Sequence, residues 1–202
     1  ITTADNNTAV GYEALLSNTT GVNNTAVGKS ACRSVTTGER NTGVGVQALG
    51  NTGVAVTNNV AVGVNALYQT TGSSNTACGD AALYANTSGT NNIGVGRNAL
   101  FLNTTGERNT AVGVYALDAN TTGTQNVAIG YQSLTSNTTG AMNVAVGDEA
   151  LLSNTTADSN TGVGNDALYA NTTGGFNVAV GANALDANTT GGNNVGMGFA
   201  AL

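Results

Sequence analysis

Few side chains in this sequence could carry out catalysis, and they do not form the pattern that a catalytic site needs. Histidine is absent, and the 202 residues include only 11 Asp or Glu and 5 Lys or Arg. Without histidine, the serine and cysteine triads that depend on it cannot form. Asp148 and Glu149 are adjacent acids, but most comparable segments of the chain lack acids at these positions. We therefore interpret the pair as a solvated surface feature and predict that the protein is not an enzyme.

The two cysteines do not indicate a metal site. Cys32 and Cys78 stand where comparable segments have Leu and Val, so we interpret both as small buried hydrophobic residues. We also predict that they are not joined, because three turns of a stacked fold would separate them by about 14 Å and a disulfide needs Cα atoms within about 7 Å. No position is regularly acidic, as calcium-binding glycine-rich repeats require.

Cofactor, nucleic-acid and membrane sites also lack support. Gly43-Val44-Gly45 imitates a phosphate loop, but neither a helix nor a lysine follows at the right offset. A net charge of −6 with five scattered cations argues against nucleic acid as a partner. No apolar run approaches the ~20 residues of a membrane span. We predict no metal, no cofactor, no nucleic-acid partner and no membrane insertion of this segment.

The chain is a tandem repeat with the consensus N-[TV]-[AG]-V-G-x-x-A-L-x-x-N-T-T-G-x-x, whose 17 positions we number from the first Asn. One repeat of 18 residues is followed by one of 16, after which the register resumes. Position 1 is always asparagine: Asn7, Asn24, Asn41, Asn59, Asn75, Asn92, Asn109, Asn126, Asn143, Asn160, Asn177 and Asn194. Position 5 is always glycine: Gly11, Gly28, Gly45, Gly63, Gly79, Gly96, Gly113, Gly130, Gly147, Gly164, Gly181 and Gly198. We interpret residues 1–202 as a single repeat array and, since Ile1 falls in mid-repeat, as a segment of a longer chain.

The repeat predicts an all-β fold. Glycine recurs twice per repeat, which excludes a long helix, and one unit is too small to bury a core without its neighbours. We predict a parallel β-solenoid (β-roll) of about twelve 17-residue coils, ~55 Å long at ~4.8 Å per coil. Positions 1–4 should form a strand, whereas adjacent Ala and Leu at positions 8 and 9 favour a short helical turn over positions 6–11. Val at position 4, Ala at 8 and Leu at 9 should form the core.

The invariant residues are interpreted as structural. The position 1 asparagines should be buried in a ladder of amides along the axis. The position 5 glycines should adopt a backbone conformation, or lie so close to another backbone, that residues with a side chain are disfavoured there. The Asn-Thr-Thr turns, as at Asn103, Asn120 and Asn137, also match the N-glycosylation sequon. We favour stacked Asn and Thr there, because one structural pattern then explains every copy.

The predicted strand leaves two apolar faces to cover. Positions 2 and 4 share one face, position 3 lies on the other, and neither face has a charge in any repeat. A sheet that is apolar on both sides is usually covered on both sides, so we predict a homo-oligomer. The alternative is a lone solenoid whose Ala-Leu segment covers the second face. Position 10 adds large apolar side chains that should also make contacts: Leu16, Tyr68, Tyr84, Phe101, Leu152 and Tyr169.

The Asn-Thr-Ala-Val-Gly units, as at residues 7–11 and 109–113, resemble repeats in the heads of trimeric autotransporter adhesins and in the shafts of phage tail fibres. The resemblance covers essentially the whole chain and implies a trimer of parallel solenoids, outside the cell on a cell surface or a virion. The sequence departs from it in its longer unit and in showing no coiled-coil stalk, membrane anchor or tail-fibre chaperone domain. Trimerisation and anchoring are therefore implied by the resemblance alone.

These observations predict a structural segment of an extracellular fibre or adhesin, which gives reach and attachment without catalysis. Its partners would be further copies of itself and a cell-surface receptor or glycan. The alternative is a solenoid that binds ice or glycan through one flat face, although Thr19 and Thr20 are adjacent and would point to opposite faces of a strand. A fibre-borne glycan-degrading enzyme would need acids gathered at one groove, and the acids here are scattered along the sequence.

Overall fold

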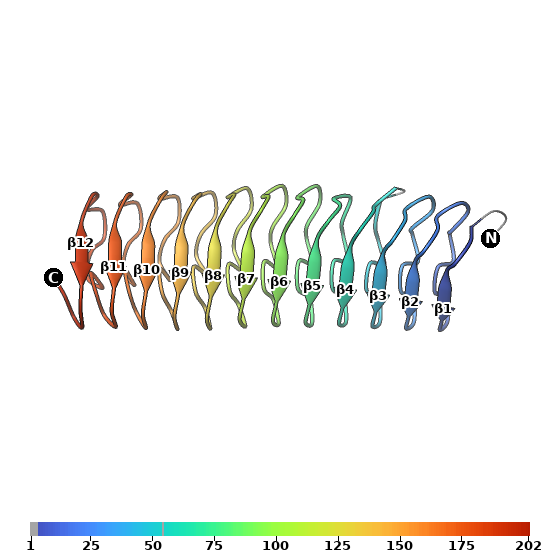
Figure 1. Ribbon diagram of the computed structural model, residues 1–202, viewed down its shortest axis with the longest axis horizontal. Coiled ribbons are helices and arrows are strands. Elements are labelled where there is room, and N and C mark those ends of the chain that lie inside the picture. The colour runs from blue at the N-terminus through green and yellow to red at the C-terminus, as the bar shows by residue number, and fades with distance from the viewer. Residues whose placement is uncertain (1–3, 54) are drawn as a thin grey trace.

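The computed structural model describes residues 4–53 and 55–202 and is a parallel β-solenoid, as predicted. Each coil contributes one strand to a single parallel sheet, in which the strands follow one another in chain order. In Figure 1 the coils stand side by side in one row, with the two termini at opposite ends of the rod. The strands are β1 (Thr8–Val10), β2 (Thr25–Val27), β3 (Thr42–Val44), β4 (Val60–Val62), β5 (Thr76–Cys78), β6 (Ile93–Val95), β7 (Thr110–Val112), β8 (Val127–Ile129), β9 (Val144–Val146), β10 (Thr161–Val163), β11 (Val178–Val180) and β12 (Val195–Met197).

The sheet keeps its register through the irregular coils. Thr42 pairs with Val60, and Val60 pairs with Thr76, so the same repeat positions meet across the 18-residue and the 16-residue unit. The extra and the missing residue both fall in the turns after the strands. The strand therefore sets the register, and the turns absorb the difference in length.

The predicted helical turn is wrong. Positions 7 and 9 have positive φ in coil after coil, for example 57° at Glu13 and 52° at Leu15. The backbone N–H of Ala14 donates to the Gly11 carbonyl at 3.3 Å, and that of Leu16 donates to Glu13 at 3.3 Å. A bond from residue i+3 to residue i with positive φ at the third residue is the pattern of a type II turn. Because left-handed residues alternate with their neighbours, no helix forms among the described residues.

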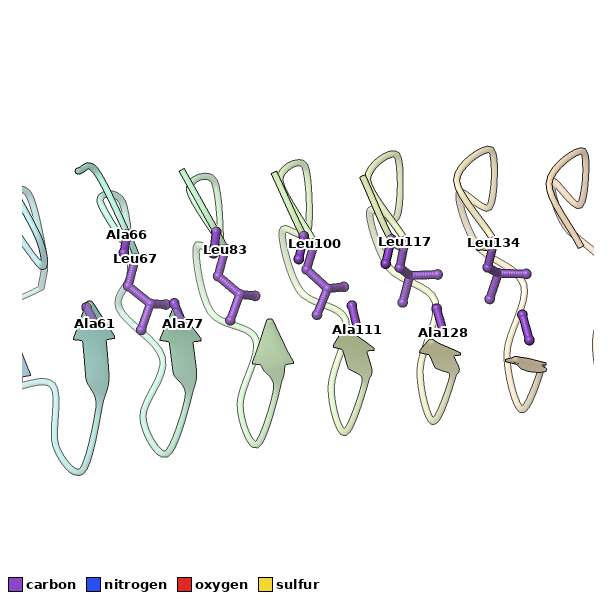
Figure 2. Packing of buried hydrophobic residues seen from close by; sticks show 14 of the residues in the cluster. Ala61, Ala66, Leu67, Ala77, Leu83, Leu100, Ala111, Leu117, Ala128 and Leu134 are labelled. Carbon is purple, nitrogen blue, oxygen red and sulfur yellow. The ribbon is translucent and has the colours of Figure 1, made fainter. Parts of the chain in front are cut away.

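The core lies between the strand and this double turn. Position 3 faces inward, and Ala77, Ala111 and their equivalents are fully buried. Figure 2 shows the position 9 leucines, such as Leu83 and Leu100, extending from the turn toward the strands. A Cβ added at Gly94 would lie 3.3 Å from Leu83 Cγ, so leucine leaves room only for Ala or Gly on the strand. In most coils the core therefore consists of the leucine at position 9 and the small residues at positions 3 and 8.

The prediction that position 4 belongs to the core is wrong. Val10, Val112 and Ile129 are exposed, because they lie on the face of the strand opposite to position 3. Cys78 occupies position 4 and is likewise exposed, whereas Cys32 at position 9 is buried, as predicted. Both cysteines are free, which confirms that they are not joined. The physical reason is the two-residue period of a strand, which points positions 3 and 4 to opposite sides.

Candidate functional site

The position 1 asparagines form a continuous ladder inside the rod. Asn126 is fully buried, and its Oδ1 accepts a hydrogen bond from the backbone N–H of Asn143 at 2.9 Å. Its Nδ2 donates to the Gly140 carbonyl at 2.8 Å, which ties the start of the coil to its last turn. The same two bonds recur along the rod, for example at Asn109, whose Oδ1 serves Asn126 at 3.0 Å. Each side chain therefore closes its own coil and bonds to the next one.

A second ladder runs through the Asn-Thr-Thr turns at position 12. There the amides bond one another directly: Asn120 Nδ2 donates to Asn103 Oδ1 at 2.7 Å, and Asn137 Nδ2 donates to Asn120 Oδ1 at 3.0 Å. The amide-to-amide ladder expected at position 1 thus lies mainly at position 12. These asparagines are fully buried, and Asn120 Nδ2 also donates to the Gly123 carbonyl at 3.0 Å. The side-chain nitrogens of Asn103, Asn120 and Asn137, to which an N-linked glycan would be attached, are therefore inaccessible in the folded rod.

Threonine hydroxyls extend the second ladder toward the surface. Thr121 Oγ1 donates to the Thr138 carbonyl at 3.0 Å, and Thr138 Oγ1 donates to Thr155 at 3.1 Å. The next threonine of each turn, such as Thr122 or Thr139, is exposed. The Thr pair is therefore divided between coil-to-coil bonding and solvent, and it does not form a flat array of free hydroxyls.

The position 5 glycines mark the closest approach between coils. Gly79 has a φ of +143°, and a Cβ there would lie 2.5 Å from the Gly96 carbonyl oxygen. Both the backbone angle and the neighbouring coil thus exclude a side chain. This contact recurs at each coil boundary in the described chain, which accounts for the invariance of the residue.

The outer face of the sheet is an exposed surface of mostly apolar residues. It consists of positions 2 and 4, which we call the sheet face. Val62, Ile93 and Val180 have 38%, 42% and 37% of their surface exposed, although each lies between two neighbouring strands. The Ala-Leu segment packs on the opposite side of the strand, so the alternative in which one chain covers both faces is wrong. No charged residue occupies either position.

Position 10 forms an aromatic edge in the middle of the rod. Tyr68 stacks on Tyr84 with ring centroids 5.3 Å apart, and Tyr84 stacks on Phe101 at 5.2 Å. The stack ends at Asp118, whose Oδ1 is buried without a hydrogen-bond partner. Burial raises the pKa of Asp118 above its usual value. The large apolar residues at this position are thus partly engaged with each other along the axis.

The structure gathers acids that are scattered in the sequence. A shallow pocket spans three successive coils and is lined by Glu149, Asp166, Tyr169, Asn183, Asp186 and Ala187. Its acids come from positions 7 and 10 of different repeats, so the expectation of scattered acids is wrong at this place. Within residues 4–53 and 55–202, no group of three or more His, Cys, Asp or Glu side chains could hold a metal ion.

Burial raises the pKa of the Cys32 thiol to about 12, against a smaller opposite effect of a hydrogen bond to the Gly43 backbone. The buried cysteine is therefore a neutral thiol at physiological pH, and Cys78 is the accessible one. Across the described part of the chain, no helix has the length and apolar character to cross a membrane. Comparison with protein-family models, with curated proteins and with solved structures finds no match to this chain.

Proposed function

We propose that this chain is a structural repeat segment of an extracellular fibre or adhesin, which gives reach between a cell surface or virion and a receptor or glycan. The observation that carries the proposal is the uninterrupted coil-to-coil bonding. Strands β1 to β12 form one sheet, and the Asn ladders bond each coil to the next along its length. Such an array lengthens by ~4.8 Å with each added coil, which is the property a spacer needs.

The invariant positions are used for stacking, which supports a mechanical role. The invariant Asn at position 1 and Gly at position 5 make contacts within the rod, and so do the commonest residues at position 9, Leu, and at position 12, Asn. The positions that vary freely lie at the surface. The adhesins and tail fibres that the repeat resembles are trimers, and we carry the trimeric state over as part of the proposal.

Electron microscopy of the native protein tests the role directly. The proposal expects thin rods that project from a cell surface or a virion. A variant with three coils duplicated, residues 109–159, should be longer by about 14 Å at ~4.8 Å per coil. A native protein that is found inside cells without an extended shape would contradict the proposal.

The sheet face supports the second candidate, binding of ice or glycan by a flat surface. It places Thr76 and Thr110 at position 2 on a regular parallel sheet, beside the position 4 residues. Thermal hysteresis of the purified rod would test ice binding, and binding to immobilised glycans would test the other ligand. Variants with lysine on the sheet face should lose the effect, because a charged side chain interrupts the flat surface.

A further inference from the structure

We infer that the sheet face binds further copies of this same chain, face against face along the rod. The inference rests on the proposed function and deepens it by naming the surface and its partner. One face of the sheet is covered by the position 9 leucines, while the other is open and carries mostly apolar side chains. The open face is uncharged and repeated at every strand from β2 to β11, and its residues are β-branched except for Cys78.

The size of the sheet face fits a stable contact. Twelve strands at ~4.8 Å and three residues at ~3.3 Å give a strip of about 55 Å by 10 Å. Its area of ~550 Å² lies at the upper end of the apolar patches that monomers expose. Two such strips would bury ~1,100 Å² together, above the ~1,000 Å² expected of a specific interface.

The shape of the strip selects the occupant. A partner must be straight over ~55 Å and must present apolar side chains at the same ~4.8 Å interval. A convex globular surface would touch only a few coils, whereas a second solenoid of this sequence matches every coil by construction. The sheet faces of neighbouring copies can then pack with interdigitated side chains, as sheet faces do elsewhere, and in the proposed trimer all three would face the common axis. The missing charge on both positions means that the contact buries no ionised side chain, whose desolvation would be the largest cost.

Cys78 is a natural reporter of this contact, because it lies on the sheet face while Cys32 is buried. Thiol labelling of the unmodified protein with a chromogenic disulfide reagent should modify Cys78 and leave Cys32 unreacted until the chain unfolds. The rate at Cys78 should fall at least ten-fold as protein concentration rises through the micromolar range, because association covers the thiol.

A matched pair of variants locates the contact. Val62 on the sheet face is 38% exposed, and Val64 in the following turn is 45% exposed, so both tolerate lysine equally well in one chain. In sedimentation velocity, Val62→Lys should weaken association about a hundred-fold, since it leaves a buried charge unpaired at the contact. Val64→Lys should associate like the unmodified protein, and far-UV circular dichroism should show that both variants are folded.

Two results would overturn the inference. One is a folded chain that stays monomeric at every concentration, with Cys78 labelled at a constant rate. The other is equal association of Val62→Lys and the unmodified protein. A folded monomer would remove the trimer from the proposed function but leave the fibre role standing, whereas an intracellular, unextended native protein would remove that role and leave the contact between copies intact.

Discussion

Replacing Asn126 by alanine tests whether the position 1 ladder stabilises the rod. The substitution removes the Oδ1 that accepts from the Asn143 backbone at 2.9 Å and the Nδ2 that donates to the Gly140 carbonyl at 2.8 Å. The Asn143 backbone N–H is then left in a buried site without a partner, whereas the Gly140 carbonyl keeps one hydrogen bond, from Asn137 Nδ2 at 3.0 Å. The bond from the Asn126 backbone N–H to Asn109 is retained, so the damage is confined to one side of the coil.

The expected loss follows from the one orphaned group. A buried donor without a partner costs about 1–3 kcal/mol, so the free energy of unfolding should fall by about that amount. With a urea dependence of about 1–3 kcal/mol per molar, the midpoint should drop by on the order of 1 M. Equilibrium urea unfolding followed by circular dichroism measures this change.

Asn165→Ala is the matched control, because the Asn165 side chain is exposed. It makes one hydrogen bond, in which Nδ2 donates to the Asp148 carbonyl at 3.3 Å. The substitution should change stability by no more than about 0.5 kcal/mol. If Asn126→Ala unfolded at the same urea concentration as this control, the ladder would not be a source of stability. The buried bonds would then have to be replaced by water or by relaxation of the coil.

Three further substitutions probe the other features of the coil. Gly79→Ala should lower the free energy of unfolding by roughly 2–5 kcal/mol, because its φ is suited to glycine and because the added methyl group would overpack against Gly96. Thermal or urea unfolding measures this change. Gly94→Ala is the control and should be nearly neutral, because alanine is the commoner residue at position 3. Leu117→Ala should cost about 2–5 kcal/mol by leaving a cavity in the core, and the exposed Leu102 offers the comparison. Because burial raises the folded-state pKa of Asp118, its ionised form opposes folding: Asp118→Asn should raise the melting temperature at neutral pH, and the gain should vanish in acid below the ordinary pKa of an aspartate, where both states are protonated.

The repeat made the coil, its strand and its stacking predictable. Seventeen residues that include an obligatory glycine, and in most repeats a second one, cannot fold alone, and apolar residues at fixed positions require stacked neighbours. The burial of Asn109, Asn126, Asn143 and Asn160 follows from the same argument. Surface positions vary from repeat to repeat, so a polar residue that never varies is expected to be buried and hydrogen-bonded. These features depend on position within the repeat, which the sequence displays directly.

The choice between the two strand faces could not be predicted in the same way. Val at position 4 is the larger and more apolar residue, so it looked like core, whereas Ala at position 3 is the one enclosed. The deciding fact is the width of the coil: Leu83 reaches the strand and leaves no space for a second branched side chain. That width is a tertiary property, set by the turn that carries the leucine.

The turn itself departs from ordinary backbone preferences. Leucine at positive φ is uncommon and costs on the order of 1–2 kcal/mol per residue, yet position 9 adopts it at Leu100, Leu117 and Leu134. Each of these side chains is fully buried, which contributes about 1.5–3 kcal/mol. The free energy gained by burying leucine in the core offsets the backbone cost. Backbone preferences read from the local sequence do not include this tertiary gain, so they could not predict the turn.

Thr70 shows what the stacked coil requires of its residues. It stands at the position 12 site of the 16-residue repeat, where most other turns have asparagine. Its Oγ1 accepts from the Gly72 backbone at 3.1 Å and from Asn86 Nδ2 at 3.2 Å, and so takes the acceptor role of an asparagine Oδ1. Thr70 therefore takes the place of an asparagine at the N-terminal end of the second ladder, and the sheet keeps its register from β4 to β5. A threonine hydroxyl can thus replace the asparagine amide as the buried acceptor in a turn that is one residue shorter.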